Sequence, residues 1–266
     1  MLSINPFAIL SETVSPIFMQ SFVILMVLLI VIGTLVDIIH KKNVKYFFEN
    51  AKKAKLSATK TLSAGEKISV ISKTIVSHIA TTSELGAGKR RVAHLLGMYG
   101  TILFWTGSAI MIFCYSSPSS DTPSFWPIIW HVGAIMTVVG GSWFWFFLRV
   151  DVYSEAHPWY RIIKADLFVL ALIASSLFGL IWSCLQSLDL NDRWDDKVFL
   201  VLYIISNFVL FGGVYWSKFA HMFYKPGASI QKNLAEADGS RDNLPPPADA
   251  PEQYGLGIDR EKAKHY

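Results

Sequence analysis

The fold of this chain is decided by residues 17–38, which read IFMQSFVILMVLLIVIGTLVDI. One charged residue, Asp37, interrupts the run close to its end. A helix needs about 20 mostly apolar residues to cross about 30 Å of hydrocarbon, so the run predicts a membrane-spanning helix. It is too long for the apolar part of a secretory signal, and its positive charges follow it. We therefore expect it to be retained as a span.

Four more apolar runs of this kind follow along the chain. They cover residues 92–115, 127–148, 166–188 and 198–219. Inside lipid, every backbone polar group has to be satisfied within a helix or a closed barrel, and these runs lack the alternation of barrel strands. The sequence therefore predicts an all-α integral membrane bundle of five transmembrane helices.

The overall composition agrees with a membrane protein and limits its chemistry. Hydrophobic residues make up 52% of the 266 positions and charged residues 17%, whereas soluble domains have about 25% charged residues. The two cysteines, Cys114 and Cys184, are too few for a metal–thiolate cluster. Neither a Ser-His-Asp arrangement nor a nucleotide-binding glycine loop is present in the sequence. We expect neither an iron–sulfur centre nor an independent catalytic site within this chain.

Lys and Arg are distributed unevenly between the segments that connect the runs. Two of the 24 lie in the segments expected on one side of the membrane, and 22 lie in those expected on the other. The poor segments are residues 1–17, 116–126 and 186–197, and the rich ones are residues 39–91, 149–164 and 217–266. Because positively charged loops stay in the cytoplasm, we predict that the N-terminus lies outside and the C-terminus is cytoplasmic.

These features divide the chain into four parts. Residues 1–38 hold the N-terminal segment and the first span, residues 39–91 a basic cytoplasmic loop, residues 92–225 a four-helix core, and residues 226–266 a Pro-rich cytoplasmic tail. In the loop, apolar residues recur at helical spacing and predict an amphipathic helix. They are Ile68, Ile71, Ile75, Val76 and Ile79. This helix is expected to lie on the anionic inner leaflet, dock a partner or cap the bundle.

The tail contains four prolines between Asn243 and Pro251, so that stretch cannot build a core of its own. Leu244, Tyr254 and Leu256 are scattered through the tail. We interpret it as a set of contact points for another protein; the alternative is an untethered disordered end.

Two of the seven histidines share a level in the predicted bundle. His94 is the third residue of the second span, and His221 follows the fifth span at the same, cytoplasmic side. A haem iron bound by two imidazoles needs donors from two helices at matched depth. We therefore predict one haem b held by His94 and His221. The alternative is that both histidines lie at the interface and contact headgroups or helix ends.

The neighbours of this pair suit a flat, charged group. Small residues follow each histidine on its helix and leave room beside it; they are Gly97, Gly100, Thr101, Gly107, Ser108, Asn207, Gly212, Gly213 and Ser217. The cations expected at the haem propionates are Lys89, Arg90, Arg91 and Lys218.

The other histidines and the ionisable residues near the spans receive weaker assignments. His131 has no partner at its level, so we expect it to bond a backbone carbonyl or a quinone headgroup; His40 and His157 are reserve ligands. A set of ionisable residues lies near the inner ends of the spans, where each is expected to reach water, although together they would form a proton path to a quinone. They are Asp37, Arg149, Asp151, Lys164 and Asp166.

Two stretches carry a resemblance to a known family. Residues 91–100, RVAHLLGMYG, and residues 215–226, YWSKFAHMFYKP, resemble the b-type cytochrome membrane subunits of respiratory complexes. Examples are the gamma subunit of nitrate reductase and the membrane subunits of heterodisulfide reductase and of the quinone-interacting oxidoreductase complex. The likeness runs from the second helix to Pro226. Residues 237–247, ADGSRDNLPPP, look most like the membrane anchor associated with dissimilatory adenylylsulfate reductase.

This resemblance has implications for the site and for function. The family's inner pair of haem ligands falls on His94 and His221, and its outer pair falls on Phe104 and Tyr203, which cannot replace imidazole. The resemblance thus implies one haem near the inner face. It implies a bacterial cytoplasmic (inner) membrane subunit that passes electrons between the quinone pool and a cytoplasmic iron–sulfur or flavin enzyme, adenylylsulfate reductase. The alternatives are a cofactor-free anchor and a small transporter, although the chain shows no internal repeat.

Overall fold

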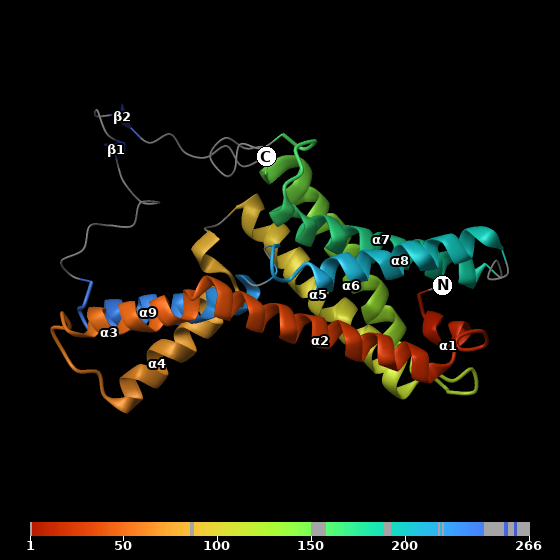
Figure 1. Cartoon of the computed structure of the whole chain (residues 1–266), viewed down its shortest axis with the longest axis horizontal. Helices are drawn as coiled ribbons and strands as arrows, with labels where there is room; N and C mark the ends of the chain where they lie inside the picture. Colours follow the sequence, from red (N-terminus) through yellow and green to blue (C-terminus); the bar gives the residue numbers. More distant parts are fainter. Residues whose placement is uncertain are drawn as a thin grey trace.

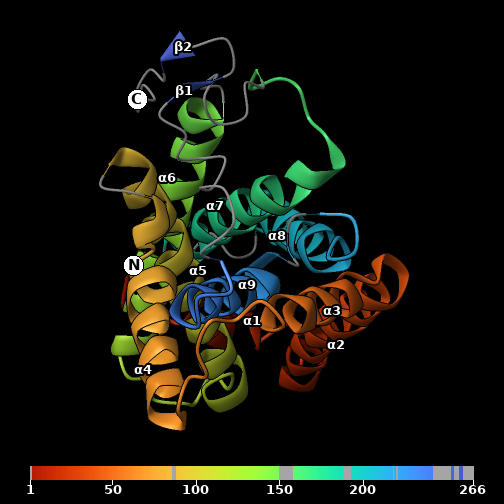
Figure 2. The same cartoon turned by 90° about the vertical axis from the view of Figure 1, so that its left-hand side faces the viewer.

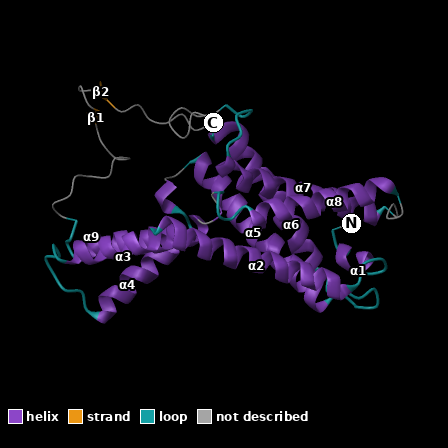
Figure 3. Cartoon of the chain, viewed as in Figure 1, coloured by secondary structure: helices purple, strands orange, loops and turns teal. Residues whose placement is uncertain are grey.

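The computed structural model describes residues 2–85, 88–149, 158–188, 193–217, 219, 221–241, 253–254 and 258–259. The described chain is helical apart from one two-residue strand pair (Figure 3). The elements are α1 (Pro6–Leu10), α2 (Pro16–Lys41), α3 (Asn43–Lys55), α4 (Ala64–Thr74), the π-helix η1 (Ile75–Ala80), the 3-10 helix η2 (Ser83–Leu85), α5 (Lys89–Cys114), α6 (Phe125–Trp143), its π-helical extension η3 (Phe144–Leu148), the 3-10 turn η4 (Lys164–Asp166), α7 (Leu167–Ser187), α8 (Trp194–Gly212), α9 (His221–Ala237), β1 (Gln253–Tyr254) and β2 (Ile258–Asp259).

Within the described ranges, four helices are long and apolar enough to cross a membrane. They are α2, α5, α6 together with η3, and η4 together with α7. Their bounds follow the first four predicted runs, and apolar residues along α2 such as Val27, Ile32 and Leu35 are about half exposed, as expected where a helix faces lipid. The chain is therefore an all-helical, multi-pass membrane protein.

The predicted fifth span is interrupted. We expected a helix over residues 198–219, but α8 ends at Gly212 and the backbone turns over residues 213–217. The uncharged part of α8, residues 198–212, rises by roughly 22 Å at 1.5 Å per residue, which is less than the hydrocarbon thickness of about 30 Å. Two consecutive glycines, Gly212 and Gly213, favour the break because glycine is a poor helix former.

Close backbone packing joins α5 to α6. A Cβ added at Gly100 would lie 2.6 Å from the backbone nitrogen of Thr137, and one added at Gly133 would lie 2.5 Å from that of Phe104. A Cβ at Gly140 would lie 2.6 Å from the backbone nitrogen of Gly97. In lipid, small residues drive helix association by letting two backbones approach. Helix α7 packs against α6, and α8 packs against α7. Helix α2 packs on the outside, against α8 and α5.

The bundle has two distinct ends (Figure 1). The short helix α1 lies at one of them against α5 and α7, and α2 finishes at the other, where α9 begins. We call these the α1 end and the α9 end. Beyond the α9 end, α3, α4 and α9 project as a helical layer, in which α9 lies between α4 and α3 (Figure 2).

Hydrogen bonds hold this projecting layer together. Asn233 of α9 donates from Nδ2 to Thr74 Oγ1 at 2.8 Å, and His78 Nδ1 lies 3.0 Å from Ser229 Oγ. Thr74 and Ser229 are buried here, whereas Ile68 of α4 is 64% exposed. Thr74 therefore lies on the packed face of α4 and Ile68 on its exposed side, whereas Ile71 is half-buried. Helix α9 runs through Pro226, where we had expected the tail to begin.

Candidate functional site

His94 lies in the second turn of α5, at the α9 end, and its side chain is exposed. The start of this helix is tied to the preceding segment because Arg91 Nε donates to the carbonyl oxygen of Thr81 at 2.7 Å. Lys89 is exposed and Arg90 is half-buried. Three of the four predicted propionate partners are therefore at the α9 end, and one of them already bonds a carbonyl. The fourth, Lys218, lies outside the described residues.

Of the three glycines predicted beside His94, Gly97 alone is left open by its described neighbours. A Cβ added there would meet no atom within 4 Å, whereas one added at Gly107 would lie 2.9 Å from Trp130 Cβ. Gly107, like Gly100, is thus filled by α6, and our expectation that both leave room for a cofactor is wrong. Ser108 is also engaged, because it donates to the Phe104 carbonyl at 2.9 Å and accepts from Trp130 Nε1 at 2.8 Å.

The small residues predicted beside His221, toward the end of α8, also differ in how much room they leave. Gly212 would carry a Cβ with no neighbour within 4 Å, whereas a Cβ at Gly213 would lie 2.6 Å from the Val209 carbonyl oxygen. Asn207 donates from Nδ2 to the Tyr203 carbonyl at 2.8 Å. Its Oδ1 accepts from Ser175 Oγ at 3.2 Å. Room among these residues is therefore confined to the end of α8.

The segment that carries His221 packs against the helix that carries His94. Phe219 is only 1% exposed, and its ring stacks on Trp105 of α5 with centroids 6.1 Å apart and planes inclined by 14°. Phe219 also meets Phe168 of α7 edge to face at 5.4 Å. The backbone of α9 begins at His221, whose side chain lies outside the described residues. The tertiary structure thus brings both predicted ligand segments to the α9 end (Figure 1).

The second ligand level of the resembled family is filled with aromatic rings. Phe104 and Tyr203 meet edge to face with centroids 6.4 Å apart, and Phe104 is 1% exposed. Trp130 lies 5.2 Å from the Phe104 ring, and Trp182 stacks on Tyr203 at 5.9 Å. Helices α5 and α8 therefore bring these two positions together, with side-chain rings in contact between them.

His131 is fully buried and bonded on both sides of its ring. Its Nδ1 lies 2.7 Å from the Pro127 carbonyl oxygen, and its Nε2 lies 2.9 Å from Ser183 Oγ. Because a carbonyl oxygen only accepts, Nδ1 carries the proton in the neutral ring and Nε2 accepts from the serine. We expected His131 to bond either a backbone carbonyl or a quinone headgroup. The structure shows the bond to a backbone carbonyl.

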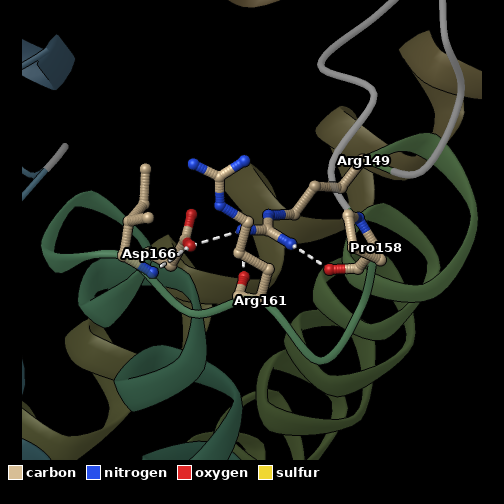
Figure 4. A network of polar contacts seen from close by, with 5 residues as sticks. Arg149, Pro158, Arg161 and Asp166 are labelled. Carbon is tan, nitrogen blue, oxygen red and sulfur yellow. Dashed lines mark hydrogen bonds and ion pairs between the residues drawn. The ribbon is translucent and has the colours of Figure 1, made fainter.

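Figure 4 shows a buried ion pair at the α9 end that the sequence did not reveal. Arg149 is fully buried, and its Nη2 lies 2.5 Å from Asp166 Oδ2. The same guanidinium donates to the carbonyl oxygens of Pro158 at 3.0 Å and Arg161 at 2.7 Å, and it lies 4.2 Å over the Trp145 ring. These contacts link the end of η3 to the residues that precede α7.

Our expectation that ionisable residues near the spans each reach water is wrong for Arg149, Asp166 and Asp37. Asp37 is 1% exposed and is paired with Lys41. Lys164 is exposed as expected, and Asp151 lies outside the described residues. Burial of a charge is tolerated only with partners. Lys41 lies one turn after Asp37 on the same helix, whereas Asp166 lies 17 residues after Arg149. A sequence pattern contains no signal for them apart from the charges themselves.

His40 is exposed and meets the Tyr215 ring edge to face at 6.0 Å. His157 and His265 lie outside the described residues. Among the described residues, no group of three His, Cys, Asp or Glu side chains could hold a metal ion. Cys114 and Cys184 form no disulfide.

Comparison of the chain with protein-family models, curated proteins and solved structures gives no match. Its function therefore has to be argued from its own residues.

Proposed function

We propose that this chain is the membrane-anchoring, cytochrome b-like subunit of a bacterial redox complex. It passes electrons between the quinone pool and a cytoplasmic iron–sulfur or flavin enzyme, for which adenylylsulfate reductase is the candidate. The chain lies in the cytoplasmic (inner) membrane as a five-span subunit, with residues 198–212 of α8 and the turn after them as the fifth crossing and with the α9 end cytoplasmic. The sidedness rests on the 22 of 24 Lys and Arg residues found in segments of that end.

The observation that carries this proposal is the stack of Phe219 on Trp105. It packs the segment of His221 on α5, the helix of His94, at a residue eleven positions after His94, or roughly 16 Å along the helix. Two axial ligands of one iron have to come from adjoining helices, and the matched depth of these two rings stays a prediction. A Cβ at Gly97 or at Gly212 would meet no atom within 4 Å, so no described neighbour fills either position. His94 and His221 would hold one haem b, with Arg90, Arg91 and Lys218 near its propionates. When bound, the haem supplies one-electron transfer between quinone and the partner enzyme.

The chain's own residues set the limits of this electron path. The rings of Phe104, Trp130, Trp182 and Tyr203 fill the level toward the α1 end. Quinone therefore exchanges electrons near the α9 end, and transfer between that end and a cytoplasmic enzyme moves little charge across the membrane. No catalytic side chain is assigned to this subunit.

The projecting layer of α3, α4 and α9 supplies the surface for the soluble enzyme. This layer carries lysines along α3, among them Lys45, Lys52 and Lys53. It also carries the exposed side chain of Ile68 on α4. Basic and apolar side chains together suit a protein partner with an acidic rim, and the tail after α9 extends the same docking region.

The proposal is tested by the spectrum of the purified subunit. Dithionite-reduced minus oxidised spectra should show a b-type band that is lost in His94→Ala and in His221→Ala. His40→Ala is the matched control, because His40 is an exposed histidine at the same end. A band that disappears only in His40→Ala would reassign the ligand, and an unchanged spectrum in both ligand variants would overturn the assignment.

A cofactor-free anchor is the second candidate, favoured by the tight filling of Gly100 and Gly107 by α6. In that case the chain only holds the enzyme at the membrane. A pyridine haemochrome assay separates the two candidates, because the anchor would contain no haem.

A further inference from the structure

Helix α2 ends in a buried carboxylate whose position needs an explanation. Asp37 is 1% exposed, near the end of a helix with largely exposed apolar neighbours. Lys41, one turn later on the same helix, forms an ion pair with it. A buried carboxylate is costly unless it is paired and hydrogen-bonded. An ion pair within α2 alone would not require burial, since an i,i+4 pair forms equally well on a solvated face.

The burial is explained by α9, which supplies a second partner. The Tyr224 hydroxyl donates to Asp37 Oδ2 at 3.0 Å. Burial and the bond to Asp37 raise the pKa of Tyr224 to about 12, so the hydroxyl keeps its proton and remains a donor. Tyr224 is three residues after His221, which is less than one helical turn. The carboxylate of α2 therefore fixes the first turn of α9.

Lys41 holds the other side of the same segment. Its Nζ donates to the Tyr215 carbonyl oxygen at 3.2 Å and lies 5.3 Å from the centre of the Tyr215 ring. About two turns before the end of α2, Gly33 leaves space for Val214, because a Cβ there would lie 2.9 Å from Val214 Cβ. Contacts from α2 thus bracket His221, with Tyr215 before it and Tyr224 after it.

We propose that Asp37 and Lys41 are positioning residues that hold the connection between α8 and α9 and so set where α9, whose backbone begins at His221, leaves the bundle. This inference rests on the proposed haem site. The connection needs such a clamp because residues 213–217 form a turn rather than a continuing helix. The stack of Phe219 on Trp105 fixes the depth of this connection in the bundle. The polar contacts with α2 fix the direction in which α9 leaves the bundle.

The test compares Tyr224→Phe and Asp37→Asn with a matched control. Tyr224→Phe removes only the hydroxyl, and Asp37→Asn removes the charge that holds Lys41. The control is Glu49→Gln, which alters an ion pair of the same i,i+4 spacing, Lys45–Glu49, on the exposed surface of α3. All three are examined in the full chain purified in detergent, with monodispersity and melting temperature as checks on folding.

Two measurements decide the outcome. Amide hydrogen exchange over residues 213–224 should be about fivefold faster in Tyr224→Phe, as expected for the loss of one hydrogen bond, and unchanged in Glu49→Gln. The electron paramagnetic resonance signal and midpoint potential of the haem should shift in both clamp variants and not in the control. Faster exchange with an unchanged haem signal would overturn the positioning role. Wild-type protein without haem would instead defeat the proposed function itself.

Discussion

The two ends of the bundle are stabilised by different kinds of contact. At the α1 end, Phe104, Trp130, Trp182 and Tyr203 form one ring cluster, and the polar His131 beside it is bonded within the bundle. At the α9 end, buried charges hold the connections between helices. The first end is filled by side-chain packing, and the second is built around turns and exposed histidines. The end with the less regular backbone is therefore the one that depends on specific polar contacts.

The largest effect is expected at the α9 end, from Arg149→Met. Removal of the guanidinium leaves the buried Asp166 carboxylate without its charge partner, which costs about 3–5 kcal/mol. Unfolding in detergent, followed by circular dichroism, measures the loss. The double variant Arg149→Met with Asp166→Leu should recover most of it, because replacing both partners by apolar groups is often neutral.

An exposed ion pair provides the control for this prediction. Arg193 and Asp195 lie 3.0 Å apart with the Arg193 side chain 56% exposed, so Arg193→Met should cost less than about 1 kcal/mol. Equal losses at Arg149 and Arg193 would contradict the view that buried charges organise the α9 end.

A smaller effect is expected near the α1 end, from Gly133→Ala. The added Cβ would lie 2.5 Å from the backbone nitrogen of Phe104, so α5 and α6 have to separate, at about 1–3 kcal/mol. The loss is read as a lower melting temperature. Gly65→Ala in α4 is the control, because its Cβ meets no atom within 4 Å and alanine favours a helix over glycine. A similar drop in both variants would show that close packing is not the cause.

The smallest effect is a pH dependence at Asp196, in the first turn of α8 ahead of its apolar run. Burial, aided by the neighbouring charge of Asp195, raises the pKa of Asp196 from 3.8 to about 6. Ionisation in the folded state is therefore disfavoured, and the group lowers stability progressively as pH rises from 3.8 to about 6, with the full loss above that range. Asp196→Asn should raise the melting temperature by a few degrees at pH 8 and by much less at pH 4. An equal shift at both pH values would contradict burial as the cause.

Much of the helical layout was predictable because a span needs a long apolar run, and such runs are local features of the sequence. The first four runs coincide with helices α2, α5, α6–η3 and η4–α7. The break at Gly212 was not predicted, although the glycine pair is visible in the sequence. Val214 and Phe219 remain buried after the break, so hydropathy does not distinguish a continuing helix from a packed turn.

The candidate site was predictable only in part. The sequence placed His94 and His221 at one level by counting along the helices, and the haem they are proposed to share stays a prediction. The use of Gly100 and Gly107 was misjudged, because a small residue leaves equal room for a cofactor or for a neighbouring helix, and only the position of α6 decides between them.

By itself, the sequence determined that this chain is helical and made for a membrane, because apolar length and backbone hydrogen bonding leave no other structure in lipid. The tertiary structure decided which groups the buried carboxylates meet. Asp37 meets Tyr224, and Arg149 meets Asp166, across long stretches of chain. The strength of such contacts depends on distance and on exclusion of water, and both are properties of the packed bundle rather than of any local run of residues.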